Sequence, residues 1–106
     1  MAQSIEIKKY LYYLFSSRED ATPVLFLYDA SNAHVAYVYF RSDSQTLPEA
    51  RQYTNGRYAL YYRRSVLPEL IDMLRNEKPI YLHWVPEGTN NTRISTTAEL
   101  IGEEET

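Results

Sequence analysis

The chain has 106 residues, of which 44% are hydrophobic and 24% charged, with no cysteine and a formal net charge of −3. This length and composition are typical of one globular domain, and they exclude a disulfide-stapled scaffold and thiolate metal sites. Because Glu103, Glu104 and Glu105 lie together near the C-terminus, the rest of the chain is neutral. We expect a single domain over 1–101 and a flexible acidic tail over 102–106, which could fold back onto a cationic surface.

The first residues, MAQSIEIKKYLYYLF, do not fit a secretory signal, because lysines interrupt their apolar residues. No window of the chain approaches the roughly 18–20 consecutive apolar residues of a membrane span. We therefore expect a cytoplasmic protein that makes no contact with a membrane.

This N-terminal segment fits two kinds of element. As a strand it would place Ile5, Ile7, Leu11, Tyr13 and Phe15 on one face, with Lys9 as an exception. As a helix over residues 5–16 it would present a stripe of Ile7, Tyr10, Leu11, Leu14 and Phe15, and the fold would then be cystatin-like. The richness in Tyr and Ile favours the strand.

Two hairpins are predicted next. The apolar run 24–29 is followed by a short turn and by 33–41, which alternates between apolar and aromatic or charged residues. Asn55-Gly56 predicts a type I′ turn that joins 51–54 to 57–64.

One helix is predicted over 66–77, with Ser65 as its N-cap and Pro68 in its first turn. Its buried stripe would contain Val66, Leu67, Leu70, Ile71 and Leu74. Residues 80–85 and 92–98 then predict a last hairpin across Pro86–Asn91. The expected fold class is α+β, an antiparallel sheet of about six to seven strands packed on one helix, in the order ββββ-α-ββ.

Catalytic and metal chemistry find little support in the sequence. The chain has no thiol and no serine in a nucleophile-elbow context, and its three glycines cannot form a phosphate-binding loop. The two histidines, His34 and His83, lack the spacing of a metal site. We expect a protein that is not an enzyme and binds no cofactor and no metal.

Tyrosines and cations alternate on the faces that the predicted strands turn outward. Residues 57–64 would present Arg57, Ala59, Tyr61 and Arg63, and 33–41 would present Tyr37, Tyr39 and Arg41. The first strand would add Lys8, Tyr10 and Tyr12, with Glu6 as the only acid. Single-stranded nucleic acid offers bases that stack on aromatic rings and phosphates that attract cations. The predicted nucleic-acid-binding residues are Lys8, Tyr37, Tyr39, Arg41, Arg57, Tyr61 and Arg63.

The same pattern has a second interpretation. Cross-strand pairs of tyrosine and arginine stabilise a sheet without any ligand, and exposed tyrosines also occur at protein interfaces. A protein-interaction or dimerising structural module, a homodimer among them, is therefore the alternative to a single-stranded DNA or RNA binder.

The stretch RYALYYRRSVLPELIDMLRNEKP delivers an aromatic strand into a short Leu-rich helix after four strands. In this order of elements, residues 24–78 resemble the unit shared by the Whirly single-stranded-DNA-binding proteins and the positive-cofactor-four coactivators. The chain also resembles small uncharacterised bacterial proteins of this form. The resemblance implies a curved antiparallel sheet, assembly through the helix, and single-stranded nucleic acid laid across the strands. The lysine-rich signature of the Whirly proteins and the basic flank of the coactivators are both missing, so no motif residue is carried over.

Overall fold

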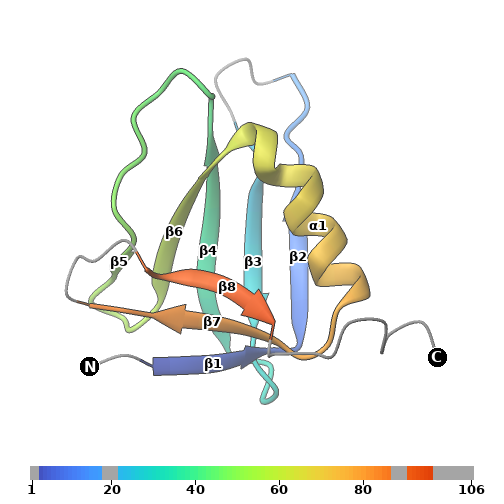
Figure 1. The fold of residues 1–106 in the computed structure, drawn as a ribbon, viewed down its shortest axis with the longest axis vertical. Helices are drawn as coiled ribbons and strands as arrows, with labels where there is room; N and C mark the ends of the chain where they lie inside the picture. The colour runs from blue at the N-terminus through green and yellow to red at the C-terminus, as the bar shows by residue number, and fades with distance from the viewer. Residues whose placement is uncertain (1–2, 18–21, 87–90, 97–106) are drawn as a thin grey trace.

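The computed structural model describes residues 3–17, 22–86 and 91–96 of the chain (Figure 1). It has the expected α+β class, with one α-helix preceded by a short 3₁₀ turn. The elements, in chain order, are β1 (Gln3–Ile7), β2 (Lys9–Tyr13), β3 (Val24–Tyr28), β4 (His34–Arg41), β5 (Arg51–Gln52), β6 (Tyr58–Arg63), η1 (Arg64–Val66), α1 (Leu67–Asn76), β7 (Ile80–Trp84) and β8 (Arg93–Thr96). The predicted acidic tail lies outside the described residues.

The strands form two sheets rather than the one that the sequence predicts. A five-stranded sheet has the order β2-β3-β4-β6-β5, and a three-stranded sheet has the order β1-β7-β8. All pairs are antiparallel except β4 and β6, which run parallel, with Tyr39 opposite Tyr61. The apolar strand β6 takes the interior place beside β4, and the exposed, polar β5 takes the edge, because only the interior place is buried.

The N-terminal segment is extended, so the cystatin-like alternative with an N-terminal helix is wrong. The chain changes sheet at Lys8: β1 pairs with β7, whereas β2 pairs with β3. The Lys8 N–H donates to the Tyr28 carbonyl at 2.8 Å. Odd-numbered side chains point into the core before this bend and away from it after the bend. Ile7 is therefore buried, while Leu11 and Tyr13 are exposed. The predicted single face from Ile5 to Phe15 therefore divides between the two sides.

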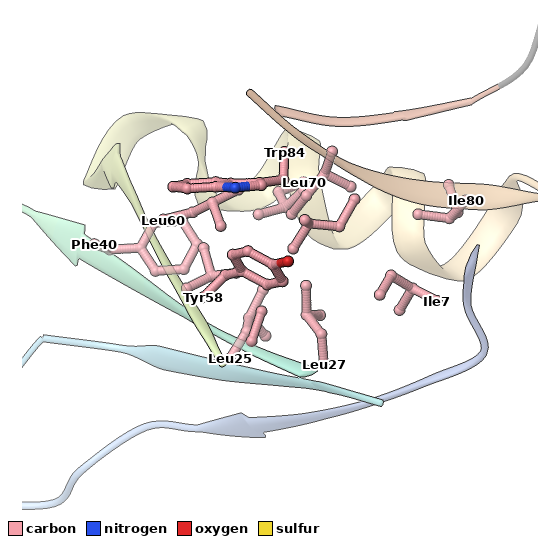
Figure 2. Close-up of a cluster of buried hydrophobic side chains, with 13 residues drawn as sticks. Ile7, Leu25, Leu27, Phe40, Tyr58, Leu60, Leu70, Ile80 and Trp84 are labelled. Atoms are coloured by element: carbon pink, nitrogen blue, oxygen red, sulfur yellow. The ribbon is translucent and has the colours of Figure 1, made fainter. Parts of the chain in front are cut away.

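The hydrophobic core lies on one face of the five-stranded sheet. In Figure 1, α1 and the three-stranded sheet both cross that same face. Figure 2 shows side chains from the sheet meeting Leu70 of α1 and Trp84 and Ile80 of β7. Tyr58 packs against Trp84 with ring centroids 4.9 Å apart, and its hydroxyl donates to Gln3 Oε1 at 3.1 Å. The residues of β3, β4 and β6 that point into this core are Leu25, Leu27, Ala36, Val38, Phe40, Tyr58 and Leu60.

The turn at Asn55-Gly56 joins β5 to β6 as predicted, but it is not of type I′. Of these two residues only Gly56 has a positive φ, of 89°. A type I′ turn requires a positive φ at both of its central residues. The Gly56 N–H donates to the Tyr53 carbonyl, and the Tyr53 N–H donates to the Arg57 carbonyl. This is a three-residue loop in which the left-handed residue, a glycine, follows a tight turn.

The start of the helix also differs from the prediction. Ser65 lies inside η1, and neither Arg63 nor Val66, which precede the two helical segments, makes a side-chain capping bond. The Ser65 N–H instead donates to Asp43 Oδ1 at 3.2 Å. The predicted capping role of the Ser65 hydroxyl is therefore wrong, and a carboxylate from a distant loop accepts from the N–H of Ser65 itself. Among the residues with described positions, no helix has the length and apolarity needed to cross a membrane.

We predict that Asp43→Ala lowers the free energy of unfolding by about 1 kcal/mol, the usual cost of losing an N-terminal helix acceptor. Ser65→Ala, the matched control, should change it by less than half of that. Urea denaturation followed by circular dichroism measures both. A larger loss in Ser65→Ala than in Asp43→Ala would contradict this account of the helix start.

Candidate nucleic-acid interface

One face of the five-stranded sheet points away from α1. It carries the side chains that alternate, along each strand, with those that point into the core. Strand pairing sets them in transverse rows: Tyr13, Val24, Tyr39 and Tyr61 share one row, and Leu11, Phe26, Tyr37 and Ala59 share the next. We call this side the outer face. Figure 1 shows α1 and the three-stranded sheet on the other side of the five strands.

Aromatic rings pack against one another along the outer face. Tyr39 stacks on Tyr37 and on Tyr61, with ring centroids 5.9 Å and 5.5 Å apart and interplanar angles of 14° and 25°. Edge-on contacts extend the cluster from Tyr37 to Phe26 and from Phe26 to Tyr13. These contacts hold the rings in place, and the rings nevertheless remain half-buried or exposed.

Cations lie over three of the rings. The Lys9 ammonium is 4.8 Å from the Tyr28 centroid, the Arg41 guanidinium 5.5 Å from Tyr61, and the Arg51 guanidinium 5.0 Å from Tyr53. Such contacts hold a cation near the ring without neutralising its charge. These three side chains therefore keep their charge available to an anion.

Two further arginines are anchored to the backbone. Arg57 donates to the His34 carbonyl at 3.2 Å and to the Tyr37 hydroxyl at 3.4 Å. Arg63 donates to the Asp43 and Gln45 carbonyls at 2.6 Å and 3.1 Å. Both retain a full positive charge, but their side chains are committed to holding the ends of the sheet.

No acidic residue occurs in β2, β3, β4, β5 or β6. Among the described residues, the acids in the connections between these strands are Asp29, in the turn after β3, and Asp43 and Glu49, between β4 and β5. Asp29 accepts hydrogen bonds from the Ser31 hydroxyl and from the Ala33 N–H, and these lower the pKa of its carboxyl. These strands therefore carry cations and no acid, although the chain is negative overall.

Tyr39, Tyr53 and Arg51 form a hydrogen-bonded group on this face. The hydrogen bond from Tyr39 and the guanidinium of Arg51 lower the pKa of the Tyr53 phenol. Burial, and after it the bond to Tyr53, raises the pKa of Tyr39. The two phenols and the guanidinium therefore interact with one another on this face.

His34 lies among aromatic rings at the start of β4. Its ring stacks on Tyr28 with centroids 5.2 Å apart and meets Tyr37 edge-on at 4.5 Å, while its Nε2–H donates to the Ala36 carbonyl at 3.0 Å. Desolvation lowers the pKa of His34, and the nearby Arg57 adds to this effect. The imidazole is therefore kept neutral, and it serves as another flat ring.

The structure brings six of the seven predicted site residues together: Tyr37, Tyr39, Arg41, Arg57, Tyr61 and Arg63. Lys8 is not among them, because it lies at the bend between β1 and β2 and pairs with Glu6 at 3.2 Å. The neighbouring Lys9 occupies the outer face instead, since the parity of the chain switches at this bend.

The sequence analysis missed several members of the cluster: Lys9, Phe26, Tyr28, His34, Arg51 and Tyr53. Phe26 and Tyr28 could have been placed on one face by the two-residue period of any strand, since both alternate with the leucines of the apolar run 24–29. Arg51 and Tyr53 gave none, because β5 has only two residues and its place at the edge depends on β6.

A pocket of about 660 Å³ lies at the β5 edge, and its lining includes Arg51, Tyr61, Tyr62 and Thr92. No group of three or more histidine or carboxylate side chains in the described ranges is placed to hold a metal ion. Comparison with protein-family models, curated proteins and solved structures finds no match to this chain.

We predict that protonation of His34 destabilises the fold. Because its pKa in the folded chain lies below the ordinary 6.5, the unfolded chain binds more protons just below that pH. Its contribution is fully present above about pH 6.5 and is lost as the pH falls through the window beneath. The free energy of unfolding, measured by urea denaturation at about pH 7.5 and about pH 5.5, should fall more in the unmodified chain than in His34→Gln. An equal fall in both proteins would contradict the prediction.

Proposed function

We propose that the chain is a non-catalytic protein that binds single-stranded DNA or RNA across the outer face of its five-stranded sheet. The observation that carries the proposal is the juxtaposition of an aromatic cluster with cations on strands that contain no acid. Single strands need both features, because each base offers a flat ring and each phosphate a negative charge.

The geometry suggests how the work is divided between residues. Tyr39 and Tyr61 would stack on bases, since they lie in one row near the centre of the sheet. Arg41, Arg51 and Lys9 would contact phosphates, since they are held by rings rather than by carbonyl groups. Arg57 and Arg63 would contribute charge while they hold the scaffold.

Duplex nucleic acid fits less well. Readers of the major groove usually present a basic helix. α1 instead carries Glu69 and Asp72 and has Arg75 as its only basic residue. A flat or gently curved sheet of aromatic residues is suited to unstacked bases.

We predict that the double variant Arg41→Gln, Arg51→Gln weakens binding to a labelled oligothymidine of about 12 nucleotides. Fluorescence anisotropy at about 0.05 M and about 0.2 M salt measures the affinity and its salt dependence. Each lost phosphate contact should reduce the slope of log affinity against log salt by about 0.7. Arg75→Gln with Lys78→Gln, at the end of α1, removes the same charge on the other side and should leave the slope unchanged.

Equal losses in the two double variants would show that net charge rather than the outer face is responsible. Absence of binding by the unmodified chain at low salt would overturn the proposal. The alternative, a protein-interaction module, would then explain the exposed tyrosines of the outer face.

We predict that Tyr61→Leu weakens oligothymidine binding by about fivefold or more, since stacking contributes roughly 1–3 kcal/mol per base. Leucine retains apolar contact with Arg41 and Tyr39 but has no π-face. Tyr81→Leu, on β7 and away from the outer face, is the matched control. A loss confined to the salt-dependent part of the binding would contradict the assignment of Tyr61 as a stacking residue.

A further inference from the structure

The exposed large hydrophobic side chains of the described residues are confined to one short segment. They are Leu11, Tyr12, Tyr13, Leu14 and Phe15. Leu11 is 42% and Leu14 66% exposed, whereas the core buries Leu25, Leu27, Leu60, Leu70 and Leu82. Contiguous apolar surface of this kind marks an interaction site in a globular protein.

The segment includes β2, which is an edge strand. β3 pairs with one side of β2, and no strand of the described ranges pairs with the other. Alternate N–H and C=O groups along this edge therefore point outward and fit another extended strand. Natural edges are usually protected by prolines, charges or short length. Residues 10–15, YLYYLF, contain no proline and no charge, whereas the opposite edge, β5, is only two residues long.

The sequence of β2 is complementary to itself. Two antiparallel copies with Leu11 opposite Leu11 would set Tyr10 opposite Tyr12 and Lys9 opposite Tyr13. Lys9, the only charge in 9–15, then faces an aromatic ring and not another cation. The same register keeps faces together, because Lys9, Leu11 and Tyr13 lie on the outer face, while Tyr12 lies beside Leu67 and Ile71 of α1.

We propose that β2 is a homodimer interface, at which two copies of the chain pair antiparallel about Leu11 to form one continuous ten-stranded sheet. Both helices then lie on one side and both outer faces on the other. The inference does not depend on nucleic-acid binding. Because a single strand edge is a small interface, the dissociation constant should be on the order of micromolar.

A charge-swap experiment tests the pairing. Analytical ultracentrifugation of the unmodified chain over a range of concentrations should show a shift from the 12.5 kDa monomer to twice that mass. Leu11→Lys alone and Leu11→Glu alone should each remain monomeric, because like charges would meet at the twofold axis. An equimolar mixture of the two variants should form the dimer again, since Lys would then face Glu. Circular dichroism confirms that each variant is folded, as expected for a half-exposed position.

Cross-linking tests the register independently. The chain has no cysteine, so Leu11→Cys introduces a single thiol at the axis. Cβ atoms of directly opposed residues are about 4.5–5.5 Å apart, close enough for a disulfide after a small adjustment. Leu11→Cys should therefore form a covalent dimer on mild oxidation. Tyr13→Cys, the control, should not, because it would lie opposite Lys9 of the other copy.

A monomer at every concentration would overturn the proposal. A dimer that persists unchanged in both Leu11→Lys and Leu11→Glu would also overturn it, since another surface would then be responsible. Restoration by the mixture, together with selective cross-linking at position 11, would establish the interface. Because all these readouts are masses measured without nucleic acid, failure here and failure of the proposed function are separate results.

Discussion

The burial of only one face of the five-stranded sheet is the constraint on which the rest of this structure depends. α1 and the three-stranded sheet pack against the same side, where Leu25, Leu27, Val38 and Phe40 are fully buried. Because side chains alternate along a strand, every residue between these must point to the other side. The side chains that alternate with the core residues are therefore gathered on the outer face as a consequence of core formation: Tyr37, Tyr39 and Arg41 of β4, and Tyr61 and Arg63 of β6.

On that face, aromatic and cationic side chains support one another. Stacked tyrosines restrict each other's rotamers. The rings of Tyr28, Tyr53 and Tyr61 in turn restrict the cationic side chains that lie over them, and these side chains keep their charge. A binding surface arranged before its ligand arrives loses less entropy on binding. The stability of the sheet and the proposed function thus have the same physical origin.

The two edges of the five-stranded sheet differ in a way that follows from the path of the chain. β5 is short and exposed beside the pocket that Arg51 lines, whereas β2 presents five residues and an apolar extension. β2 reaches this place because the chain leaves the three-stranded sheet at Lys8 and enters the larger one. The bend that connects the two layers thereby creates the edge at which two copies would join.

Local patterns in the sequence determined much of this protein. The alternation of 33–41 predicted which side chains of β4 are buried, because a two-residue period is a property of the strand itself. The same reasoning located the hairpin at Asn55-Gly56, the helix near 66–77 and the last hairpin, and six of the seven residues that it predicted for the site lie on or beside the outer face. What only the tertiary structure decided are features set by distant parts of the chain. The parallel pairing of β4 with β6 depends on which strand of a hairpin is apolar enough for an interior position. The acceptor at the helix start comes from Asp43, 22 residues before Ser65. Lys9 replaces Lys8 on the outer face because a change of sheet reverses the parity, and no local pattern records which sheet a strand will join.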